Sequence, residues 1–341
     1  MKRSKADITR RQFLQRSAQG VGLLGVGVSA AHSARAAEKA ASPFAYDVVR
    51  FSQTDSKLIQ YEQVSRFASP HPQPRRLSIG PGNRLYIATR DGVDVLDRDG
   101  GGVQSIGLSE PARCVAAAED GTLYVGLRER IEVFDRQGQR VATWESPGPK
   151  TWLTGLAVAE NAVYAADSGG RMIWRYDRAG KLAGRVAEKS LERKVPGLIV
   201  PSPYLDVALG RDGLLRVNNP GRHCVESYTG DGDLELSWGE PSAAIQGFCG
   251  CCNPIGLALL PDGRCVTCEK GFPRVKIYLA TGTFECVVAG PESFPENGKA
   301  GSVQSLSDGS MGGLDAAVDS DGRIYILDLV AGDVRVMKRK A

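Results

Sequence analysis

Eight cysteines are the residues of this 341-residue chain that could most plainly carry chemistry. Five of them fall between positions 249 and 268, in the segments GFCGCCNP and RCVTCEKGFPRVKIY. Thiolates favour soft metal ions and iron–sulfur clusters, and Gly250 would let the backbone fold tightly around such a centre. The spacing therefore predicts a thiolate-bound metal or an iron–sulfur cluster used in redox chemistry or electron transfer. The candidate ligands are Cys249, Cys251 and Cys252, with Cys268 or Cys114 as the fourth thiolate.

Disulfide formation is the competing chemistry for the same thiols. An even number of cysteines in an exported protein permits a framework of bridges without any metal, and the adjacent Cys251 and Cys252 could form a strained vicinal disulfide. The spacing C-x-C-C matches no standard zinc or cluster motif. Cys224 and Cys286 are expected on outer strands as buried, unreactive thiols. Metal binding and disulfide formation both stay open for residues 249–252.

The elements that must position these thiols follow from a repeat that runs through most of the chain. An apolar strand, a turn with Asp-Gly or a similar pair, a second strand that often contains Tyr, and a third strand recur six times. Short alternating runs bounded by Gly, Asp and Asn are typical of antiparallel strands. The residues that anchor the six second strands are Tyr86, Tyr124, Tyr164, Arg216, Val266 and Tyr325.

Six such units predict an all-β protein, a single six-bladed β-propeller over residues 37–341. The last unit ends after its third strand, so a strand from the N-terminal side must complete that blade and close the ring; Tyr46–Phe51 is the candidate. The copies resemble NHL repeats over residues 77–341. This resemblance implies a fold more than a reaction, because NHL-type and related propellers include lactonases, lyases and binding scaffolds.

Propeller topology brings the beginnings of the first strands and the ends of the second strands to one face, the mouth of the central channel. The first strands are expected to begin at Arg76, Cys114, Thr154, Asp206, Gly256 and Asp315. Oxygen-bearing side chains at the ends of second strands could bind a divalent cation such as Ca²⁺. These side chains are Asp167, Asn219, Glu269 and Asp328. The competing interpretation is that they hydrogen-bond their own turns, or that Glu269 pairs with Lys270 or Arg274.

Residues 1–36 have the features of a twin-arginine (Tat) signal peptide. Arg10-Arg11 precede Phe-Leu, a Gly-rich apolar run of 11 residues covers 21–31, and Ala34-Arg35-Ala36 forms a cleavage pattern. A run of this length is too short to span a bilayer, so no permanent membrane span is expected. The Tat translocase is the expected partner during export, and the periplasm is the expected location. GFCGCCNP, EKGFPRVKIY and VVAGPESF also resemble a group of Tat-exported bacterial NHL-repeat proteins, which implies a location but no reaction.

The net positive charge of the chain comes from residues 1–36. The whole sequence has 43 Lys and Arg against 39 Asp and Glu, but residues 1–36 hold seven of the bases and one acid. The remainder has 36 bases and 38 acids. Such a balance lacks the basic excess that nucleic-acid binding requires, so no nucleic-acid partner is expected.

Three functions are compatible with these observations. A thiolate-bound metal, or a cluster, at the mouth would serve redox chemistry. A mouth-bound divalent cation would resemble the site of lactonase-type propellers, and this resemblance implies a hydrolase in which the ion polarises an ester carbonyl and activates water. Long segments between blades should lie over the same face, where they could hold a protein or small-molecule partner without catalysis.

Overall fold

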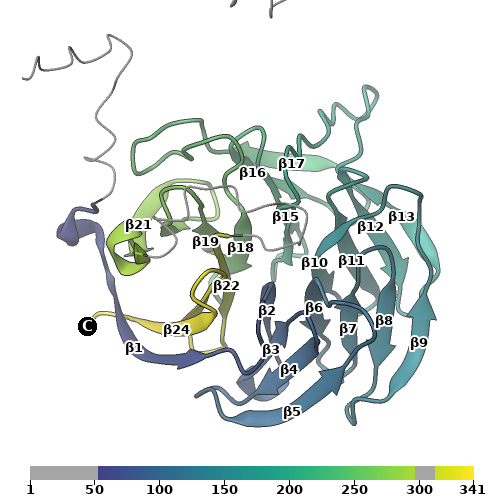
Figure 1. The fold of residues 1–341 in the computed structure, drawn as a ribbon. Helices are drawn as coiled ribbons and strands as arrows, with labels where there is room; N and C mark the ends of the chain where they lie inside the picture. The colour runs from purple at the N-terminus through teal and green to yellow at the C-terminus, as the bar shows by residue number, and fades with distance from the viewer. Residues whose placement is uncertain (1–52, 296–311) are drawn as a thin grey trace, which may run out of the picture. The chain divides into compact units, whose positions relative to one another are not determined.

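The computed structural model describes residues 53–295 and 312–341, and its strands form six four-stranded antiparallel sheets. Each sheet is one blade, and the six blades surround a central channel (Figure 1). The innermost strands contact one another in the cyclic order β2, β6, β10, β14, β18, β22 and again β2. The predicted six-bladed β-propeller is therefore confirmed.

The first three blades follow the sequence repeat closely. Blade 1 consists of β2 (Arg76–Gly80), β3 (Arg84–Ala88), β4 (Gly92–Leu96) and β5 (Gly102–Gly107). Blade 2 consists of β6 (Cys114–Ala117), β7 (Leu123–Gly126), β8 (Ile131–Phe134) and β9 (Arg140–Trp144). Blade 3 consists of β10 (Leu153–Val158), β11 (Ala162–Asp167), β12 (Met172–Asp177) and β13 (Leu182–Val186).

The other three blades include the cysteine-rich segment and the closing strand. Blade 4 consists of β14 (Val207–Leu209), β15 (Leu215–Asn219), β16 (Cys224–Tyr228) and β17 (Leu234–Trp238). Blade 5 consists of β18 (Gly256–Leu259), β19 (Cys265–Cys268), β20 (Val275–Tyr278) and β21 (Phe284–Ala289). Blade 6 consists of β22 (Leu314–Val318), β23 (Ile324–Asp328), β24 (Asp333–Arg339) and β1 (Tyr61–Ala68). The described helices are single 3₁₀ turns: η2 (Ser56–Leu58), η3 (Pro81–Asn83) and η4 (Pro291–Ser293).

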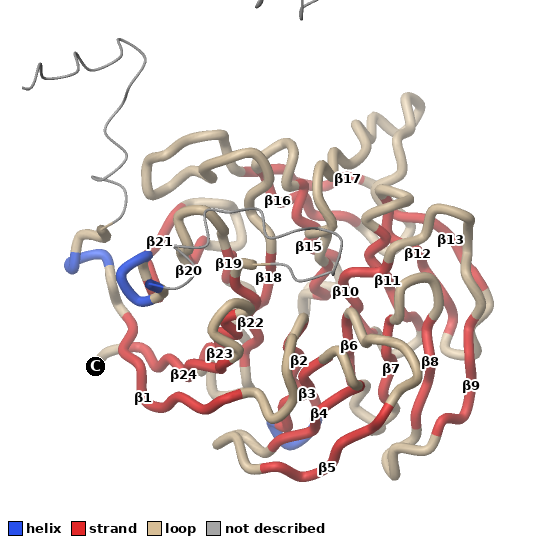
Figure 2. The backbone as a smooth tube through the Cα atoms, viewed as in Figure 1, coloured by secondary structure: helices blue, strands red, loops and turns tan. Residues whose placement is uncertain are grey.

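Burial within each blade explains the residue pattern of its strands. The middle strands are buried on both faces because they lie between neighbouring blades, as in the fully buried β7 and β8. The outermost strands are mostly exposed in five blades, as in β9, whereas β21 of blade 5 is mostly buried. The segments that join the blades run over one face, drawn as long tan loops in Figure 2. No helix within the described ranges is long and apolar enough to cross a membrane.

The turns between the third and fourth strands show why the repeat is rich in Asp and Gly. The Asp177 carboxylate accepts hydrogen bonds from the backbone N–H groups of Ala179 and Lys181. Gly180 then adopts a φ of +91°, which favours glycine. A Cβ atom at Gly180 would also collide with the Trp144 ring of blade 2. The same glycine therefore shapes the turn and permits the close packing of two blades.

The strand that closes the ring is β1, and this corrects the prediction that Tyr46–Phe51 does so. Tyr61 pairs with Arg339 and Ala68 with Asp333, in antiparallel register. The Arg66 guanidinium adds an ion pair with Asp333. The β1 strand was missed because most of its side chains are exposed, so it lacks the apolar alternation of an inner strand. The segment Tyr46–Phe51 lies outside the described residues.

Removal of β1 should destabilise the whole propeller. A chain that begins at Ser69 should lose at least about 3 kcal/mol of unfolding free energy, because β24 loses its partner and Tyr61, only 3% exposed, leaves the core. A chain that begins at Thr54 keeps β1 and is the matched control. Denaturant unfolding followed by circular dichroism would measure both. Equal losses in the two chains would contradict the assignment of β1 as the closing strand.

Candidate functional site at the channel mouth

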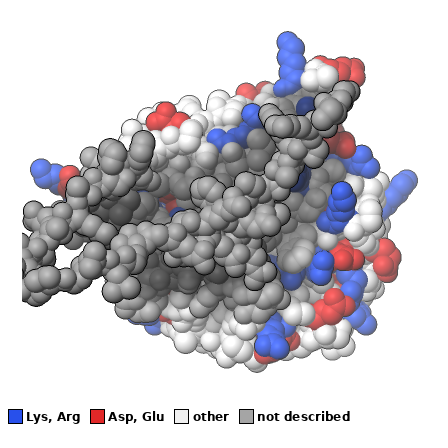
Figure 3. All heavy atoms as spheres, turned by 45° about the horizontal axis from the view of Figure 1, so that its top comes forward, with Lys and Arg blue, Asp and Glu red and all other residues white. Residues whose placement is uncertain are grey.

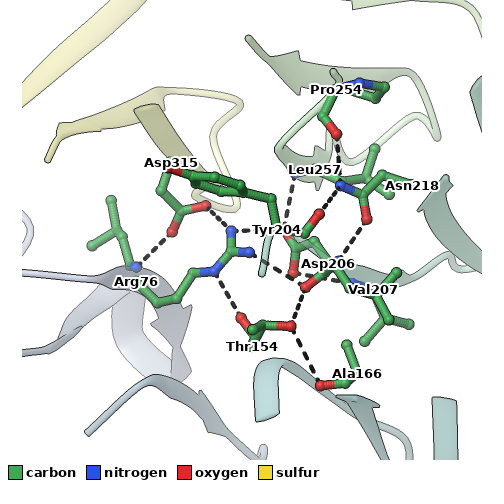
Figure 4. Close-up of polar contacts among 12 residues, drawn as sticks. Arg76, Thr154, Ala166, Tyr204, Asp206, Val207, Asn218, Pro254, Leu257 and Asp315 are labelled. Carbon is green, nitrogen blue, oxygen red and sulfur yellow. Dashed lines mark hydrogen bonds and ion pairs between the residues drawn. The ribbon is translucent and has the colours of Figure 1, made fainter. Parts of the chain in front are cut away.

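A buried cluster of charges centred on Arg76 occupies the channel mouth (Figure 4). The Arg76 guanidinium donates to Asp315 Oδ1 at 2.7 Å and to Asp206 Oδ2 at 3.2 Å. Its Nε donates to the carbonyl oxygen of Thr154 at 2.8 Å. These residues stand at the start of the first strand in blades 1, 3, 4 and 6, as the repeat predicted. A single side chain therefore connects four of the six blades.

Asp206 extends this network to blade 5. Its Oδ2 accepts a hydrogen bond from the Leu257 N–H at 2.9 Å, and its own N–H donates to Asn218 Oδ1 at 2.6 Å. The Asn218 amide then donates to the carbonyl of Pro254 at 2.8 Å. The segment that follows the cysteine motif is thus fixed to the central charges.

The network leaves one excess negative charge in a buried place, and this perturbs Asp206. Burial raises the pKa of Asp206 to about 6, and the neighbouring Asp315 carboxylate acts in the same direction while Arg76 opposes it. Burial also disfavours the charged form of Arg76, but Asp206 and Asp315 outweigh it and raise the pKa of Arg76. A cavity of about 270 Å³ lies along the inner strands, and its wall includes Arg76, Asp206 and Asp315.

The four oxygen-bearing residues predicted as a cation site are each used by their own blade. The Asp167 carboxylate accepts from the Trp152, Gly169 and Gly170 N–H groups and from the Trp174 indole N–H. All four bonds are 2.8–3.0 Å long. The carboxylate is fully buried and has no free direction toward the channel.

Glu269 forms ion pairs with two cations of its own blade. Arg274 Nη2 lies 2.8 Å from one carboxylate oxygen, and Lys276 Nζ lies 2.7 Å from the other. Glu269 also accepts from the Cys249 N–H at 3.2 Å. The predicted alternative, an ion pair with Arg274, is what the structure contains.

Asn219 and Asp328 complete the same pattern. Asn219 Oδ1 accepts from the Ile199 N–H, and its amide group donates to Glu226. Asp328 accepts from the Val330 and Ala331 N–H groups and pairs with Arg335 at 3.3 Å. The four residues serve as clamps at equivalent positions of blades 3 to 6. Because their oxygens are committed to protein donors, this set does not fit a bound divalent cation.

The cysteine motif brings two thiols together at the mouth. Cys251 Sγ lies 3.3 Å from Cys252 Sγ; Cys251 is exposed, whereas Cys252 is only 2% exposed. Burial opposes ionisation of Cys252, but polar contacts with Ser202, Lys270 and Cys251 outweigh it and hold its pKa below the usual thiol range. The hydrogen bond to Cys252, together with partial burial, raises the pKa of Cys251. The pair is therefore asymmetric in both exposure and ionisation.

Asn253 holds the backbone of this motif in place. Its side-chain amide donates to the carbonyls of Cys249 and Lys270, and its Oδ1 accepts from the Lys270 N–H at 2.9 Å. Lys270 is therefore fixed next to the motif. Its ammonium lies 4.1 Å from the centre of the Tyr204 ring, and the Tyr204 hydroxyl donates to the Gly312 carbonyl.

The proposed fourth ligands do not join this pair. Cys114 is buried beside Arg76 and Asp206, and Cys268 is buried beside Asp315, Arg76 and Asp206. Burial raises the pKa of Cys114 to about 12 and raises that of Cys268 even more strongly. Within residues 53–295 and 312–341, no three Cys, His, Asp or Glu side chains are arranged to hold a metal ion. The four-thiolate set expected from the spacing is therefore not assembled among the described residues.

The remaining cysteines are buried, as the sequence indicated for two of them. Cys224 lies on β16, Cys265 on β19 and Cys286 on β21, and all eight cysteines carry free thiols in this structure. Sequence reasoning missed the residues that surround Cys252, which are Ser202, Tyr204 and Lys270. Lys270 stands two residues after Cys268. The sequence did offer a signal for Lys270, because the pairing of β18 with β19, with Gly256 opposite Cys268, brings together the residues just before β18 and just after β19. Ser202 and Tyr204 come from the segment that leads into blade 4, and no local pattern predicts their place beside Cys252.

Comparison with known proteins supports the fold alone. No family model and no curated sequence matches the chain. A streptogramin B lyase structure has a TM-score of 0.55 at 12% identity and covers 82% of this chain and 98% of its own. Virginiamycin B lyase from Staphylococcus aureus gives 0.52 at 11%, covering 82% and 100%. A Bacteroides thetaiotaomicron protein described as of unknown function gives 0.56 at 14%, covering 82% and 76%. This chain is thus a six-bladed propeller similar in fold to these lyases and to NHL-like proteins.

The raised pKa of Asp206 predicts an unusual dependence of stability on pH. In the folded protein the pKa of Asp206 is about 6, whereas in the unfolded chain it is near the ordinary aspartate value of 3.8. Its contribution to stability is therefore present at low pH and is lost as pH rises through about 6. Denaturant unfolding gives the unfolding free energy of the wild type and of Asp206→Asn. The wild-type value minus the variant value should be about 1 kcal/mol larger at pH 5 than at pH 7. A difference that does not change with pH would contradict the assignment.

Proposed function

We propose that this protein is an exported β-propeller that acts through a dithiol redox centre formed by Cys251 and Cys252. The observation that carries the proposal is the 3.3 Å separation of the two sulfur atoms, one exposed and one buried. Sulfur atoms this close can form a bond after a small movement, because an S–S bond is about 2.05 Å long. A thiol–disulfide centre needs only these two residues, whereas a cluster needs a set that is not assembled.

The asymmetry of the pair suggests a role for each thiol. Cys251 is accessible, so its sulfur attacks a disulfide of the partner. The S–S bond of the partner breaks, one partner thiolate leaves, and the proton of Cys251 passes to that thiolate. Cys252 is protected, and Lys270 favours its ionisation. Its thiolate then attacks the Cys251 sulfur of the mixed disulfide, and the second partner thiolate leaves. The pair ends as a disulfide, and the partner's disulfide has been reduced to two thiols.

The compartment and the partner agree with this chemistry. Export through the Tat route to the periplasm, proposed from residues 1–36, would place the pair where disulfides form and persist. The partner, a protein or a small molecule that carries a disulfide, would meet the pair at the face covered by the long loops. The divalent-cation hydrolase expected as an alternative receives no support, since its four oxygen-bearing residues are already paired.

Reaction with oxidised glutathione, followed by acid quenching and mass spectrometry, tests the two roles. The wild type should release two glutathione molecules and close an internal Cys251–Cys252 disulfide. Cys252→Ser should stop at a stable mixed disulfide on Cys251, and Cys251→Ser should hardly react because Cys252 is buried. Cys286→Ser, which removes a buried thiol of β21, is the matched control and should behave like the wild type. Wild-type protein that accumulates mixed disulfides without closing would refute the proposal.

The pH dependence of ring closure tests the part of Lys270. The closure rate should fall as pH drops through the pKa of Cys252, which lies below the usual thiol value. Lys270→Met should raise this pKa, because it removes a cation and a hydrogen-bond donor, and so slow closure at pH 7 by up to roughly tenfold. A purely structural role of Lys270 would leave the midpoint of the pH profile unchanged.

The export route has its own test. Replacement of Arg10 and Arg11 by Lys should block export, and the unprocessed precursor should accumulate in the cytoplasm. Cell fractionation with immunoblotting measures both, and N-terminal sequencing of the wild type should begin at Ala37. Continued export of the double variant would show that the chain does not depend on the Tat route.

A further inference from the structure

Three arginines gather at the mouth over blades 1 to 3, in a place that the proposed redox chemistry does not use. Arg113 precedes β6, Arg128 follows β7, and Trp152 precedes β10. The guanidinium carbons of Arg113 and Arg128 lie 4.4 and 4.6 Å from the centre of the Trp152 ring. Arg75, which precedes β2, is the third cation and acts on Arg113 through its charge. We call Arg113, Arg128 and Trp152 the arginine–tryptophan cluster.

The positive charge of this cluster is poorly neutralised. Within the described part of the chain, no carboxylate forms an ion pair with Arg113, and Arg128 has one loose contact, 3.5 Å, with the exposed Glu129. Arg130, two residues further on, instead pairs with both Glu110 and Glu132. Arg130 therefore forms ion pairs because acidic side chains lie within its reach, which is not the case for Arg113 among the described residues.

The electrostatic environment of Arg113 agrees with this account. Burial, together with the charges of Arg75 and Arg128, lowers the pKa of Arg113 to about 10. Among the described residues, Asp167 forms no ion pair with Arg113 or Arg128; its oxygens accept from Trp152 N–H, Gly169 N–H, Gly170 N–H and the Trp174 indole. Among the described residues, the folded protein therefore keeps Arg113 and Arg128 on the same indole ring with only the loose Arg128–Glu129 contact to neutralise them.

A second observation points to a ligand. The indole N–H of Trp152 is buried and has no hydrogen-bond partner among the described residues. A buried donor without an acceptor costs about 1–3 kcal/mol, so its retention beside two guanidinium groups needs an explanation. An anionic oxygen would accept from the indole and from the guanidinium groups alike.

The backbone around the cluster is rigid enough to form a built site. Arg113 N–H donates to the Gly126 carbonyl at 2.8 Å, and Leu153 N–H donates to the Arg128 carbonyl at 2.9 Å. Trp152 is held on both sides, because its N–H donates to Asp167 and its carbonyl accepts from Ser168 N–H. The donors are therefore positioned by strand ends of blades 2 and 3 before any ligand arrives.

We propose that the arginine–tryptophan cluster is a binding site for the oxyanion group of a small molecule, a phosphate or a carboxylate. Guanidinium groups match such oxygens with paired, charge-assisted hydrogen bonds. A nucleic acid is disfavoured because the chain beyond residue 36 has more acidic than basic residues. Figure 3 agrees, since Lys and Arg alternate with Asp and Glu on the part of this face that is drawn in colour. The proposal is independent of the thiol pair, which belongs to another blade.

Calorimetric titration at low ionic strength with inorganic phosphate and, separately, with succinate tests the site. The wild type should bind at least one of them saturably; binding of phosphate alone identifies a phosphate site, and binding of succinate alone identifies a carboxylate site. Arg113→Met keeps an apolar chain on Trp152 and should weaken binding roughly 10- to 100-fold. Trp152→Phe keeps a ring but removes the N–H and should weaken it roughly fivefold. Arg211→Gln, an exposed arginine in the β14–β15 turn, is the matched control and should bind like the wild type.

Thermal unfolding separates a binding site from a structural cluster. Phosphate or succinate, whichever binds, should raise the melting temperature of the wild type and of Cys251→Ser, but not that of Arg113→Met. Without ligand, Arg113→Met should melt no lower than the wild type, because it removes like-charge repulsion. The proposal is wrong if neither anion binds the wild type, if Arg113→Met binds as tightly as the wild type, or if only single-stranded nucleic acid binds.

Discussion

The ion pairs of Arg76 with Asp206 and Asp315 are the interaction on which the mouth of this propeller depends. Six blades that repeat one pattern must meet at a central axis, where each contributes the start of its first strand. Arg76 bonds to groups of blades 3, 4 and 6, and Asp206 continues to blade 5 through the Leu257 N–H. The buried charges are costly in isolation, but each is matched by an opposite charge or a backbone donor. The central network therefore sets the positions of the loops that start from it.

The same solution recurs one step further from the axis. Asp167, Asn219, Glu269 and Asp328 stand at the ends of second strands, and each accepts N–H groups of its own turn or of the segment that enters its blade. Glu269 holds the Cys249 N–H in this way, with Arg274 and Lys276 as its counter-charges. Acidic residues that look like a cation site in the sequence are thus the clamps that order the loops of the mouth.

Against this ordered background, two groups at the mouth stand out because their bonding is incomplete. The Cys251–Cys252 pair presents one accessible thiol backed by a buried thiol, beside a fixed lysine. The arginine–tryptophan cluster presents cations without matching carboxylates and a buried indole N–H without an acceptor. Both lie on loops held by rigid strand ends, where binding and catalysis are usually built. The two proposals thus assign unrelated chemistries to one face of the fold.

Much of the architecture was determined by the sequence alone. The repeat identified all six second strands, because buried strands and Asp-Gly turns depend on local patterns. It also placed Arg76, Asp206 and Asp315 at one mouth, since blade topology follows directly from the repeat. The closing strand was not predicted, because β1 is an exposed edge strand and no local sequence pattern indicates its pairing with β24.

The partners of the side chains were decided only by the tertiary structure. Cys114 and Cys268 were expected as ligands together with the thiols of residues 249–252, yet β6 and β19 bury them next to Arg76. Ser202 and Cys252 come from the segments that lead into blades 4 and 5, so only the meeting of these two blades brings them together. The physical reason is that residue type and spacing specify which strand and which end a side chain occupies, whereas its direction depends on packing between blades. The sequence alone thus determined the positions of the candidate residues, and the packing of the blades determined which of them can react together.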